Sequence, residues 1–350
     1  MKILRYILFP FSILYGLLMW IRNQLYNWGI IKQTSFDIPI ICVGNLSTGG
    51  TGKTPHVEYL IRLLRNNFRL ATLSRGYGRK TKGFVLATQA DDSYAIGDES
   101  KQYLSKFDTV SVAVCESRVA GVRKLLNLIF DLECIVLDDG FQHRSMKPGL
   151  SILLTDYYSL YANDFVLPTG NLREFRMGAH RANIIVVTKT PKVLSPITCR
   201  SIEEQLKISP NQKLYFSYLK YGLPVPLTDA AIDKPIDNVS SILLFAGIAN
   251  VYPLEAHLKH QSNEVIVMKF SDHHDFTKED IGKVKSTFLN IYTKNKVLMT
   301  TEKDYMRLQA SKLIEILNDV PLYFVPVQVE FHKENKDKFN KQILEYVSKN

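Results

Sequence analysis

Cysteine is scarce in this sequence, and its four copies lie too far apart to form a recognisable metal site or disulfide framework. Cys42, Cys115, Cys134 and Cys199 include no CxxC pair. Two of them, Cys42 and Cys134, lie inside apolar runs typical of strands. The pattern argues against a disulfide-stapled secreted scaffold and a cysteine-based zinc domain, and it indicates reduced core cysteines in a cytosolic setting.

Long hydrophobic runs are also lacking, apart from one near the start of the chain. The segment ILFPFSILYGLLMWI, fifteen residues between Arg5 and Arg22, is interrupted by Pro10 and Gly16. A bilayer crossing takes about 20 apolar residues, and no small-residue cleavage site follows. We therefore expect residues 1–32 to form a hydrophobic interfacial helix on a membrane surface, with its aromatic side chains at head-group level. Burial against protein and a transmembrane span stay open as alternatives.

Acidic residues are in deficit: 34 Asp and Glu face 44 Lys and Arg, which gives a formal charge of +10. This excess favours an acidic partner such as phosphate, anionic lipid or nucleic acid. No helix-turn-helix, zinc or stacking-aromatic pattern accompanies it, so a nucleic-acid partner is not expected. With 46% hydrophobic residues over 350 positions, the chain is long enough for two folded α/β domains.

A phosphate-binding loop follows the first strand-like run, residues 38–43. The sequence STGGTGKT matches the P-loop pattern except that Ser47 replaces its first glycine. The glycines let the backbone turn its N–H groups toward phosphate oxygens, Lys53 would reach the β- and γ-phosphates of ATP, and Thr54 would ligate Mg²⁺. A glycine-rich turn without a ligand is the alternative. The predicted nucleotide-binding residues are Ser47, Thr48, Gly49, Gly50, Thr51, Gly52, Lys53 and Thr54.

Acidic and basic residues follow two further strand-like runs. Asp138 and Asp139 come directly after an apolar run, and we expect Asp138 to hold Mg²⁺ while Asp139 acts on the substrate side. An ordinary Asp-Gly turn is the alternative. Arg75 and Arg79 lie in a glycine-containing loop that can bind phosphate or be merely solvated. Apolar runs separated by helix-length segments indicate a parallel sheet with covering helices, and ligands collect at the carboxyl ends of such strands.

Eight segments together resemble the tetraacyldisaccharide 4'-kinase family. They are VGNLSTGGTGKTP (43–55), LSRGYGR (73–79), GDES (97–100), ESRVAG (116–121), LDDGFQHR (137–144), LPTGNLRE (167–174), FSDHHDF (270–276) and TTEKD (300–304). The resemblance implies transfer of the ATP γ-phosphoryl group, with Mg²⁺, to the 4'-hydroxyl of a tetraacylated disaccharide 1-phosphate, the lipid A precursor. It implies a peripheral or monotopic enzyme at the cytoplasmic face of the bacterial inner membrane, with no obligate protein partner.

The resemblance also implies roles for individual residues. Asp98 resembles the family's catalytic base, although by itself it reads as a helix-capping acid. A histidine of the DHH segment, His273 or His274, would orient that carboxylate, and Asp139 completes the predicted catalytic set. The arginines of 173–181 can instead form a basic face that meets anionic lipid. Residues expected to contact the substrate, the transferring phosphate or the metal shell are Arg75, Arg79, Arg118, Gln142, His143, Arg173 and Glu174.

The predicted domain organisation has three parts after the N-terminal helix. Residues 33–212 are expected to form a P-loop NTPase-type α/β domain, 213–239 a two-stranded linker and 240–350 a smaller α/β domain. The smaller domain would face the P-loop domain, and closure of the cleft would exclude water. The segment 300–304 is a candidate for contacting the nucleotide base.

Two other functions fit parts of the sequence. A soluble P-loop ATPase or GTPase that drives protein targeting or metal delivery suits the loop, but Thr48 stands where one such subgroup has lysine. Nucleotide turnover that needs no lipid would favour this reading. A nucleotide-gated membrane-surface binding protein without transfer chemistry is the third reading. It predicts that Asp98→Ala leaves function intact.

Overall fold

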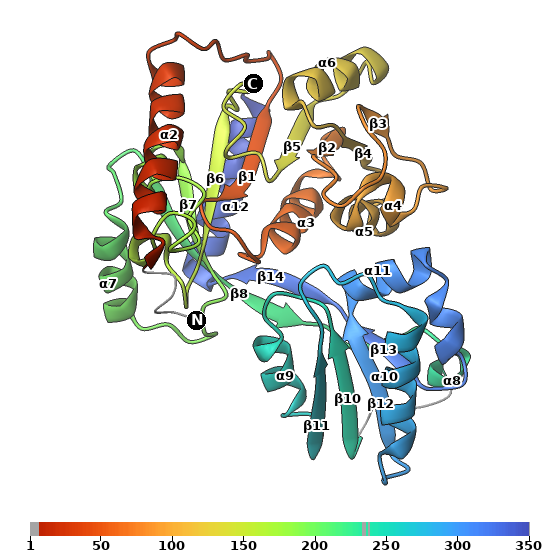
Figure 1. Ribbon diagram of the computed structural model, residues 1–350. Helices are drawn as coiled ribbons and strands as arrows, with labels where there is room; N and C mark the ends of the chain where they lie inside the picture. The colour runs from red at the N-terminus through yellow and green to blue at the C-terminus, as the bar shows by residue number, and fades with distance from the viewer. Residues whose placement is uncertain (1–6, 233–235, 237–238, 350) are drawn as a thin grey trace.

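The computed structural model describes residues 7–232, 236 and 239–349, which build two sheets with their covering helices (Figure 1). Within these residues the larger sheet has nine strands in the order β14-β8-β7-β6-β1-β5-β2-β4-β3. Its strands are β1 (Ile40–Asn45), β2 (Leu70–Ser74), β3 (Val85–Leu86), β4 (Ser111–Val114), β5 (Cys134–Asp138), β6 (Leu150–Asp156), β7 (Ile184–Thr188), β8 (Lys213–Tyr221) and β14 (Val327–Phe331). All adjacent pairs from β8 to β4 are parallel, and the two outer pairs are antiparallel.

Helices cover both faces of this sheet because its central strands are apolar on both sides. Every residue of β1, β5 and β7 is buried. The associated helices are α2 (Phe9–Asn27), α3 (Lys53–Leu64), α4 (Ser93–Ile96), α5 (Asp98–Lys106), α6 (Arg118–Leu128), η1 (Tyr161–Asn163), η2 (Arg176–Arg181), α7 (Pro196–Leu206) and α12 (Lys333–Ser348). The predicted α/β class with a large, mainly parallel sheet is confirmed.

The smaller sheet has the strand order β11-β10-β12-β13-β9 and its own core. Its strands are β9 (Val225–Pro226), β10 (Ser241–Ala246), β11 (Glu264–Lys269), β12 (Lys296–Thr301) and β13 (Leu322–Val325). The accompanying helices are α8 (Asp229–Ile232), α9 (Tyr252–Leu258), α10 (Lys278–Asn290), α11 (Glu302–Ala310) and η3 (Leu313–Leu317). A capping box formed by Thr277 and Asp280 starts α10.

Two strands, β8 and β14, carry the chain between the two parts of the molecule (Figure 1). They pair antiparallel at the edge of the larger sheet, so the chain leaves along one and returns along the other. After the return, α12 packs on the larger sheet through Phe339 and Ile343, and the Ile40 N–H donates to Tyr346 Oη (3.1 Å). The domain boundaries set from the sequence stay a prediction, and residues 233–235, 237–238 and 350 of those ranges lie outside the described residues.

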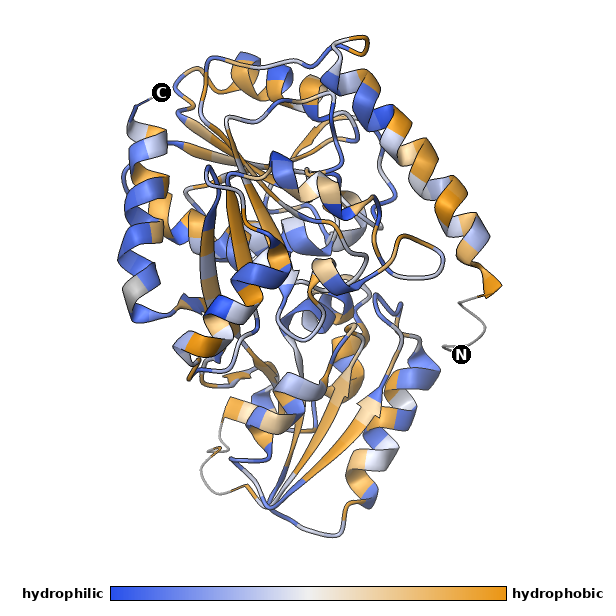
Figure 2. Cartoon of the chain, turned by 90° about the vertical axis from the view of Figure 1, so that its left-hand side faces the viewer, coloured by the Kyte–Doolittle hydropathy of each residue, from blue (hydrophilic) through white to orange (hydrophobic). Residues whose placement is uncertain are grey.

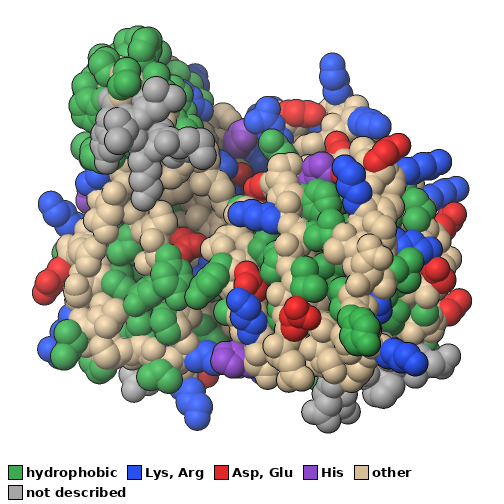
Figure 3. All heavy atoms as spheres, turned by 60° about the horizontal axis from the view of Figure 1, so that its bottom comes forward, with side chains coloured by type: hydrophobic (Ala, Val, Ile, Leu, Met, Phe, Trp, Pro, Cys, Tyr) green, Lys and Arg blue, Asp and Glu red, His purple; other side chains and the backbone are tan. Residues whose placement is uncertain are grey.

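Helix α2 lies along one side of the larger part and shows two different faces (Figure 2). Toward the protein, Ser12 Oγ donates to Thr169 Oγ1 (2.7 Å), and a Cβ on Gly16 would lie 2.5 Å from the Phe175 ring. The opposite face is apolar and exposed, and hydrophobic side chains cover the projecting end of the helix (Figure 3). No helix within the described residues combines the length and apolarity needed to cross a membrane. Residues 1–6 of the predicted interfacial helix lie outside the description.

Candidate active site

The loop between β1 and α3 has the strand-loop-helix setting that the sequence predicts. Gly49 and Gly52 adopt φ values of +107° and +85°, a region that side-chain-bearing residues rarely occupy. Asn45, the last residue of β1, donates from Nδ2 to Thr51 Oγ1 (2.9 Å) and accepts at Oδ1 from Lys53 Nζ (3.4 Å). The loop is therefore tied internally around the lysine that begins α3.

The same loop is also held from outside. Its carbonyls accept from Thr188 Oγ1 at Thr51 (2.9 Å), from the Lys189 ammonium at Gly50 and from His56 Nδ1 at Gly52 (2.7 Å). Burial lowers the pKa of His56 to about 4, so its ring is neutral at pH 7 and serves the loop rather than the substrate. On the near side of the loop, Ser47 forms a β-bridge with Leu172, and the Thr48 N–H donates to the Asn171 carbonyl (2.7 Å). These contacts with neighbouring segments thus fix the shape of the phosphate loop.

Asp138 ends β5 as a buried carboxylate with one unused oxygen. Its side chain accepts from Tyr103 Oη at Oδ2 (2.9 Å), whereas the buried Oδ1 has no hydrogen-bond partner among the described residues. Burial raises the pKa of Asp138 to about 6, and the nearby charges of Glu99 and Asp139 act in the same direction. An unpaired buried carboxylate oxygen is costly unless a cation or donor satisfies it. The donor chemistry therefore fits Mg²⁺, whose preferred ligands are oxygens.

Asp139, the next residue, has the opposite environment. It adopts φ +50°, which turns its carboxylate toward two cations, Lys53 Nζ (3.7 Å) and Arg173 Nη1 (3.1 Å). Burial raises the pKa of Asp139, but Lys53 and Arg173 outweigh it and hold that pKa below its ordinary value. Lys53 lowers the pKa of both adjacent aspartates, but only at Asp139, which is also paired with Arg173, do the cations outweigh burial.

Several residues predicted to contact the substrate, the transferring phosphate or the metal shell lie around this acidic turn. The buried Arg118 donates from Nη1 to the Cys115 carbonyl (2.8 Å) and from Nη2 to the carbonyls of Asp138 and Asp139 (3.4 Å each). Gln142 accepts from Arg173 Nη1 (3.3 Å). Its amide nitrogen donates to the Asn45 carbonyl (2.8 Å) and to Glu174 Oε1 (3.3 Å), and Glu174 also pairs with Arg181 (2.7 Å). Arg173 is the member of this group whose guanidinium meets the Asp139 carboxylate.

The remaining predicted substrate residues are placed differently. Burial lowers the pKa of His143 to about 4, and the charges of Arg118 and Arg75 act in the same direction. This histidine is therefore neutral at pH 7. Arg75 is exposed beside it. Arg79 donates from Nη2 to Glu116 and to the Gly83 carbonyl (2.6 Å), whereas its buried Nε and Nη1 have no hydrogen-bond partner among the described residues.

A second charged cluster forms where α5 meets the smaller part of the molecule. Asp98 begins α5, and its Oδ2 accepts from Arg307 Nε on α11 (2.8 Å). His273 Nδ1 lies 3.6 Å from the same oxygen, and Arg307 Nη2 lies 2.9 Å from that ring nitrogen. Burial raises the pKa of Asp98, but the neighbouring His273 and the charge of Arg307 hold that pKa below its ordinary value. Asp98 is therefore ionised at neutral pH.

The two histidines of the DHH segment separate here, which answers a question the sequence left open. His273, with φ +58°, lies at Asp98. His274 Nε2 instead lies 2.9 Å from Asp280 Oδ2, within the cap that starts α10. Of the two predicted catalytic histidines, the structure brings only His273 to the carboxylate.

Sequence reasoning missed three residues that complete this cluster, namely Arg307, Lys303 and Glu99. Lys303 pairs with Glu99 (2.7 Å) and approaches His273 Nε2 (3.1 Å). Lys303 and Arg307 are four residues apart on α11, so they share one face. That spacing alone does not show which partner the shared face meets. In this arrangement Lys303 faces the Asp98 cluster, and Asp304 accepts from the Gly247 N–H (3.0 Å). The predicted contact of the segment 300–304 with the nucleotide base stays a prediction.

One residue joins the two clusters. Tyr103 lies on α5, the helix that begins with Asp98, and its hydroxyl donates a hydrogen bond to Asp138 at the end of β5.

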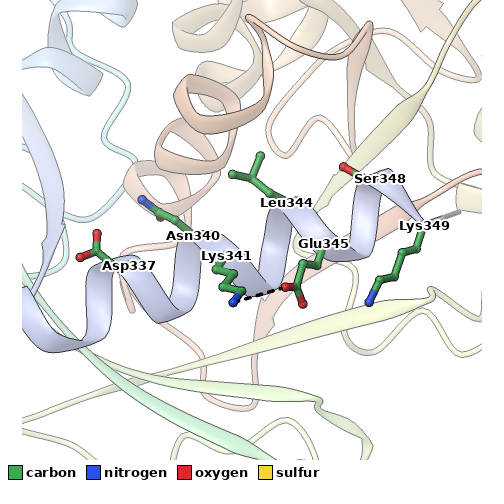
Figure 4. A pocket seen from close by; sticks show the side chains of 7 residues that line it. All are labelled: Asp337, Asn340, Lys341, Leu344, Glu345, Ser348 and Lys349. Carbon is green, nitrogen blue, oxygen red and sulfur yellow. Dashed lines mark ion pairs between the residues drawn. The ribbon is translucent and has the colours of Figure 1, made fainter.

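A separate hollow of about 480 Å³ runs along α12 and is lined by residues such as Leu344 and Glu345 (Figure 4). None of its lining residues belongs to either cluster. The candidate active site is therefore the region between the phosphate-loop lysine, the Asp138–Asp139 turn and Asp98.

Comparisons with known proteins point to one family. A family model described as LpxK, tetraacyldisaccharide-1-P 4'-kinase, matches residues 4–348. The tetraacyldisaccharide 4'-kinase of Flavobacterium johnsoniae is 47% identical, and the match covers 100% of this chain and 99% of that protein. The tetraacyldisaccharide 4'-kinase of Bacteroides thetaiotaomicron is 43% identical, and the match covers 98% of this chain and 93% of that protein. A crystal structure described as "apo" form LpxK from Aquifex aeolicus in complex with ATP has 28% identity and a TM-score of 0.71, covering 98% of this chain and 99% of that one. The family predicted from the motifs is confirmed, and this chain belongs to the tetraacyldisaccharide-1-P 4'-kinase family.

Proposed function

We propose that this chain transfers the γ-phosphoryl group of ATP to the 4'-hydroxyl of tetraacyldisaccharide 1-phosphate in lipid A biosynthesis. The observation that carries the proposal is the Tyr103–Asp138 hydrogen bond (2.9 Å), because it ties the helix that begins with Asp98 to the strand end beside the phosphate loop. Phosphoryl transfer needs positioning and charge neutralisation more than covalent chemistry. A phosphate loop, a cation-binding carboxylate and an ionised carboxylate held by the other part of the molecule supply these functions.

For the nucleotide half of the reaction, we propose that the loop around Lys53 is a P-loop that binds the phosphates of ATP. Lys53 lies 3.7 Å from Asp139 and would exchange this partner for the β- and γ-phosphates of ATP. Mg²⁺ would be held by Asp138 Oδ1 and by Thr54 in the first turn of α3. When bound, the ion neutralises charge on the transferring phosphoryl group. Arg173, released from Asp139 in the same way, can engage a phosphate oxygen.

The acceptor half rests on Asp98. Its Oδ2 is occupied by Arg307, so we assign Oδ1 to orient the 4'-hydroxyl and accept its proton. Arg307 keeps the carboxylate ionised before reaction, and His273 adjoins the same group. Because Asp98 and Arg307 come from the two parts of the molecule, the base is set only when those parts are together. Such closure excludes water and limits futile hydrolysis of ATP.

The direct test is transfer of labelled γ-phosphate from Mg·ATP to tetraacyldisaccharide 1-phosphate in detergent micelles. The expected result is labelled lipid that requires both substrates, with little release of free phosphate when the lipid is omitted. Robust hydrolysis of ATP or GTP without lipid, and no labelled lipid, would support the targeting-ATPase reading instead. Nucleotide binding with no turnover of either kind would support the binding-protein reading.

We propose further that the enzyme is peripheral or monotopic at the cytoplasmic face of the inner membrane, where ATP and an acylated substrate meet, and no protein partner is part of this proposal. Support comes from Phe11, Leu14 and Leu18, which share one face of α2 and are each more than half exposed. An exposed apolar stripe of this kind on a helix is typical of interfacial membrane binding.

The triple variant Phe11→Ser/Leu14→Ser/Leu18→Ser is expected to lose vesicle binding by about 100-fold, because burying each apolar side chain contributes roughly 1.5–3 kcal/mol when complete. Transfer to detergent-solubilised substrate should persist. Sedimentation with vesicles containing anionic lipid measures the effect. The matched control is Leu223→Ser/Leu289→Ser, two exposed leucines elsewhere on the surface. Unchanged sedimentation of the triple variant would contradict the membrane proposal.

A further inference from the structure

A further ionic cluster, distinct from the one at Asp98, lies where helices α3, α5 and α11 meet. Lys106, the last residue of α5, donates to Glu58 Oε1 on α3 (2.7 Å) and to Glu302 Oε2, at the first residue of α11 (2.6 Å). Gln102 donates to the same two carboxylates at 2.7 and 3.2 Å. We refer to Glu58, Lys106 and Glu302 as the ionic triad. None of its members belongs to the phosphate loop, the acidic turn or the Asp98 cluster.

The triad is buried far more than ordinary surface ion pairs. The side chains of Glu58, Lys106 and Glu302 are 0%, 21% and 5% exposed. Glu58 also accepts from Arg62 Nη2 (2.7 Å), so its two oxygens have three donors. Burying charge costs desolvation energy that can equal the attraction gained, so such a cluster is a poor source of stability. Its best-attested use is to fix one arrangement of the elements that it joins.

The arrangement that it fixes is the one the site requires. Helix α3 begins with Lys53, α5 begins with Asp98, and α11 carries Arg307. Asp98 and Lys106 are eight residues apart on α5 and therefore lie near one face, about two turns apart. At one end of the contact between α5 and α11, Lys106 holds Glu302, and at the other end Arg307 holds Asp98. Together with the Lys303–Glu99 pair, these two contacts hold the helices against sliding or swinging past each other.

We propose that the ionic triad is a positioning device for phosphoryl transfer, in which Lys106 and Glu302 set α11 against α5 and α3 so that Arg307 and His273 meet Asp98 at a fixed distance from Lys53. The proposal rests on the proposed roles of Asp98 and Lys53. It assigns Lys106 and Glu302 to positioning, because neither reaches the reacting atoms.

The test variant is Lys106→Met, which keeps the length and apolar stem of the side chain but removes the charge. Misplacement of a catalytic group by about 1 Å can cost on the order of 100-fold in rate. We therefore expect kcat to fall 10- to 100-fold while KM for ATP stays within about twofold, because the phosphate loop is held by other partners. Lys106→Arg, which can still bridge two carboxylates, should recover most of kcat.

Two further variants separate positioning from general damage. Glu302→Gln keeps the shape of the side chain and should lower kcat in the same way. The double variant Lys106→Met/Glu302→Gln should be no worse than the poorer single variant, because residues that act as one unit are not additive. The matched control is Lys285→Met, which removes a lysine that pairs with Asp319 (2.6 Å) within the smaller part of the molecule. Its kcat should stay within about twofold of wild type.

Unchanged kcat in Lys106→Met and Glu302→Gln, a loss confined to KM for ATP, or additive effects in the double variant would overturn the proposal. If Lys106→Met does not fold, as judged by its thermal transition, Glu302→Gln and Lys106→Arg decide. Asp98→Asn is measured in parallel: full activity there would remove the proposed base and would overturn the positioning proposal with it, because the triad is proposed to serve the contacts at Asp98. Absence of lipid phosphorylation by wild type would be a failure of the proposed function alone.

Discussion

Replacing Asp98 by alanine is expected to lower kcat by on the order of 10³-fold while ATP binding changes little. The loss has two sources: the proton acceptor for the 4'-hydroxyl disappears, which is worth about 10²–10⁴-fold, and Arg307 loses its partner across the two parts of the molecule. The phosphate loop and Lys53 come from a different segment, so nucleotide affinity should persist. Single-turnover transfer and equilibrium ATP binding, measured on the same preparation, separate the two effects.

The control for Asp98→Ala is Asp92→Ala. Asp92 is a nearby aspartate that caps α4 by accepting from the Ala95 N–H (2.9 Å) and touches no group of the site. Loss of a cap costs about 1 kcal/mol of stability, and kcat should stay near that of wild type. If Asp98→Ala kept full transfer activity, Asp98 would be merely a capping acid as well. Another group of the site would then have to accept the proton of the 4'-hydroxyl.

The parts of the site that could be predicted from the sequence are those whose residues all lie in one short segment of the chain. The loop around Lys53 and the Asp138–Asp139 turn each depend on neighbours within a few residues, so glycine spacing and an apolar run reveal them. Arg307 could not be found in this way. It meets Asp98, 209 positions earlier in the chain, and nothing in α11 alone distinguishes a guanidinium aimed at a carboxylate from one on a solvated helix face.

Adjacent residues were the hardest to separate. His273 and His274 differ only in backbone conformation, because a left-handed φ of +58° at His273 turns one ring toward Asp98 and leaves the other on the α10 cap. Non-glycine residues rarely adopt this conformation, so a sequence pattern gives no sign of it. A similar limit applies to β8. Its antiparallel partner is β14, about a hundred positions later, and local alternation of side chains cannot name a distant partner.

Replacing Asp138 by asparagine is expected to stabilise the protein while reducing its activity about 10²- to 10³-fold. Burial raises the pKa of Asp138 from 3.8 to about 6, so the folded state binds a proton more tightly than the unfolded state does. Stability therefore falls as pH rises from about 4 to about 6, and at pH 8 the ionised carboxylate costs about 3 kcal/mol. Asparagine removes this cost and can still accept from Tyr103. Without the carboxylate, however, Asp138 would no longer hold Mg²⁺ through a charged ligand, so the charge neutralisation that the ion would supply to the transferring phosphoryl group would be weaker.

Thermal unfolding of the nucleotide-free protein between pH 4 and pH 8, together with the Mg²⁺ dependence of transfer, checks both halves of this prediction. The stability advantage of Asp138→Asn should be largest above pH 6 and vanish near pH 4, and half-maximal activity should need more Mg²⁺. The control is Asp139→Asn. Lys53 and Arg173 hold the pKa of Asp139 low against its burial, so losing this charge should destabilise the protein at pH 8 instead. A fall in stability in both variants would mean that the unpaired oxygen of Asp138 is satisfied by a protein partner, and Asp138 would no longer fit a site kept open for a cation.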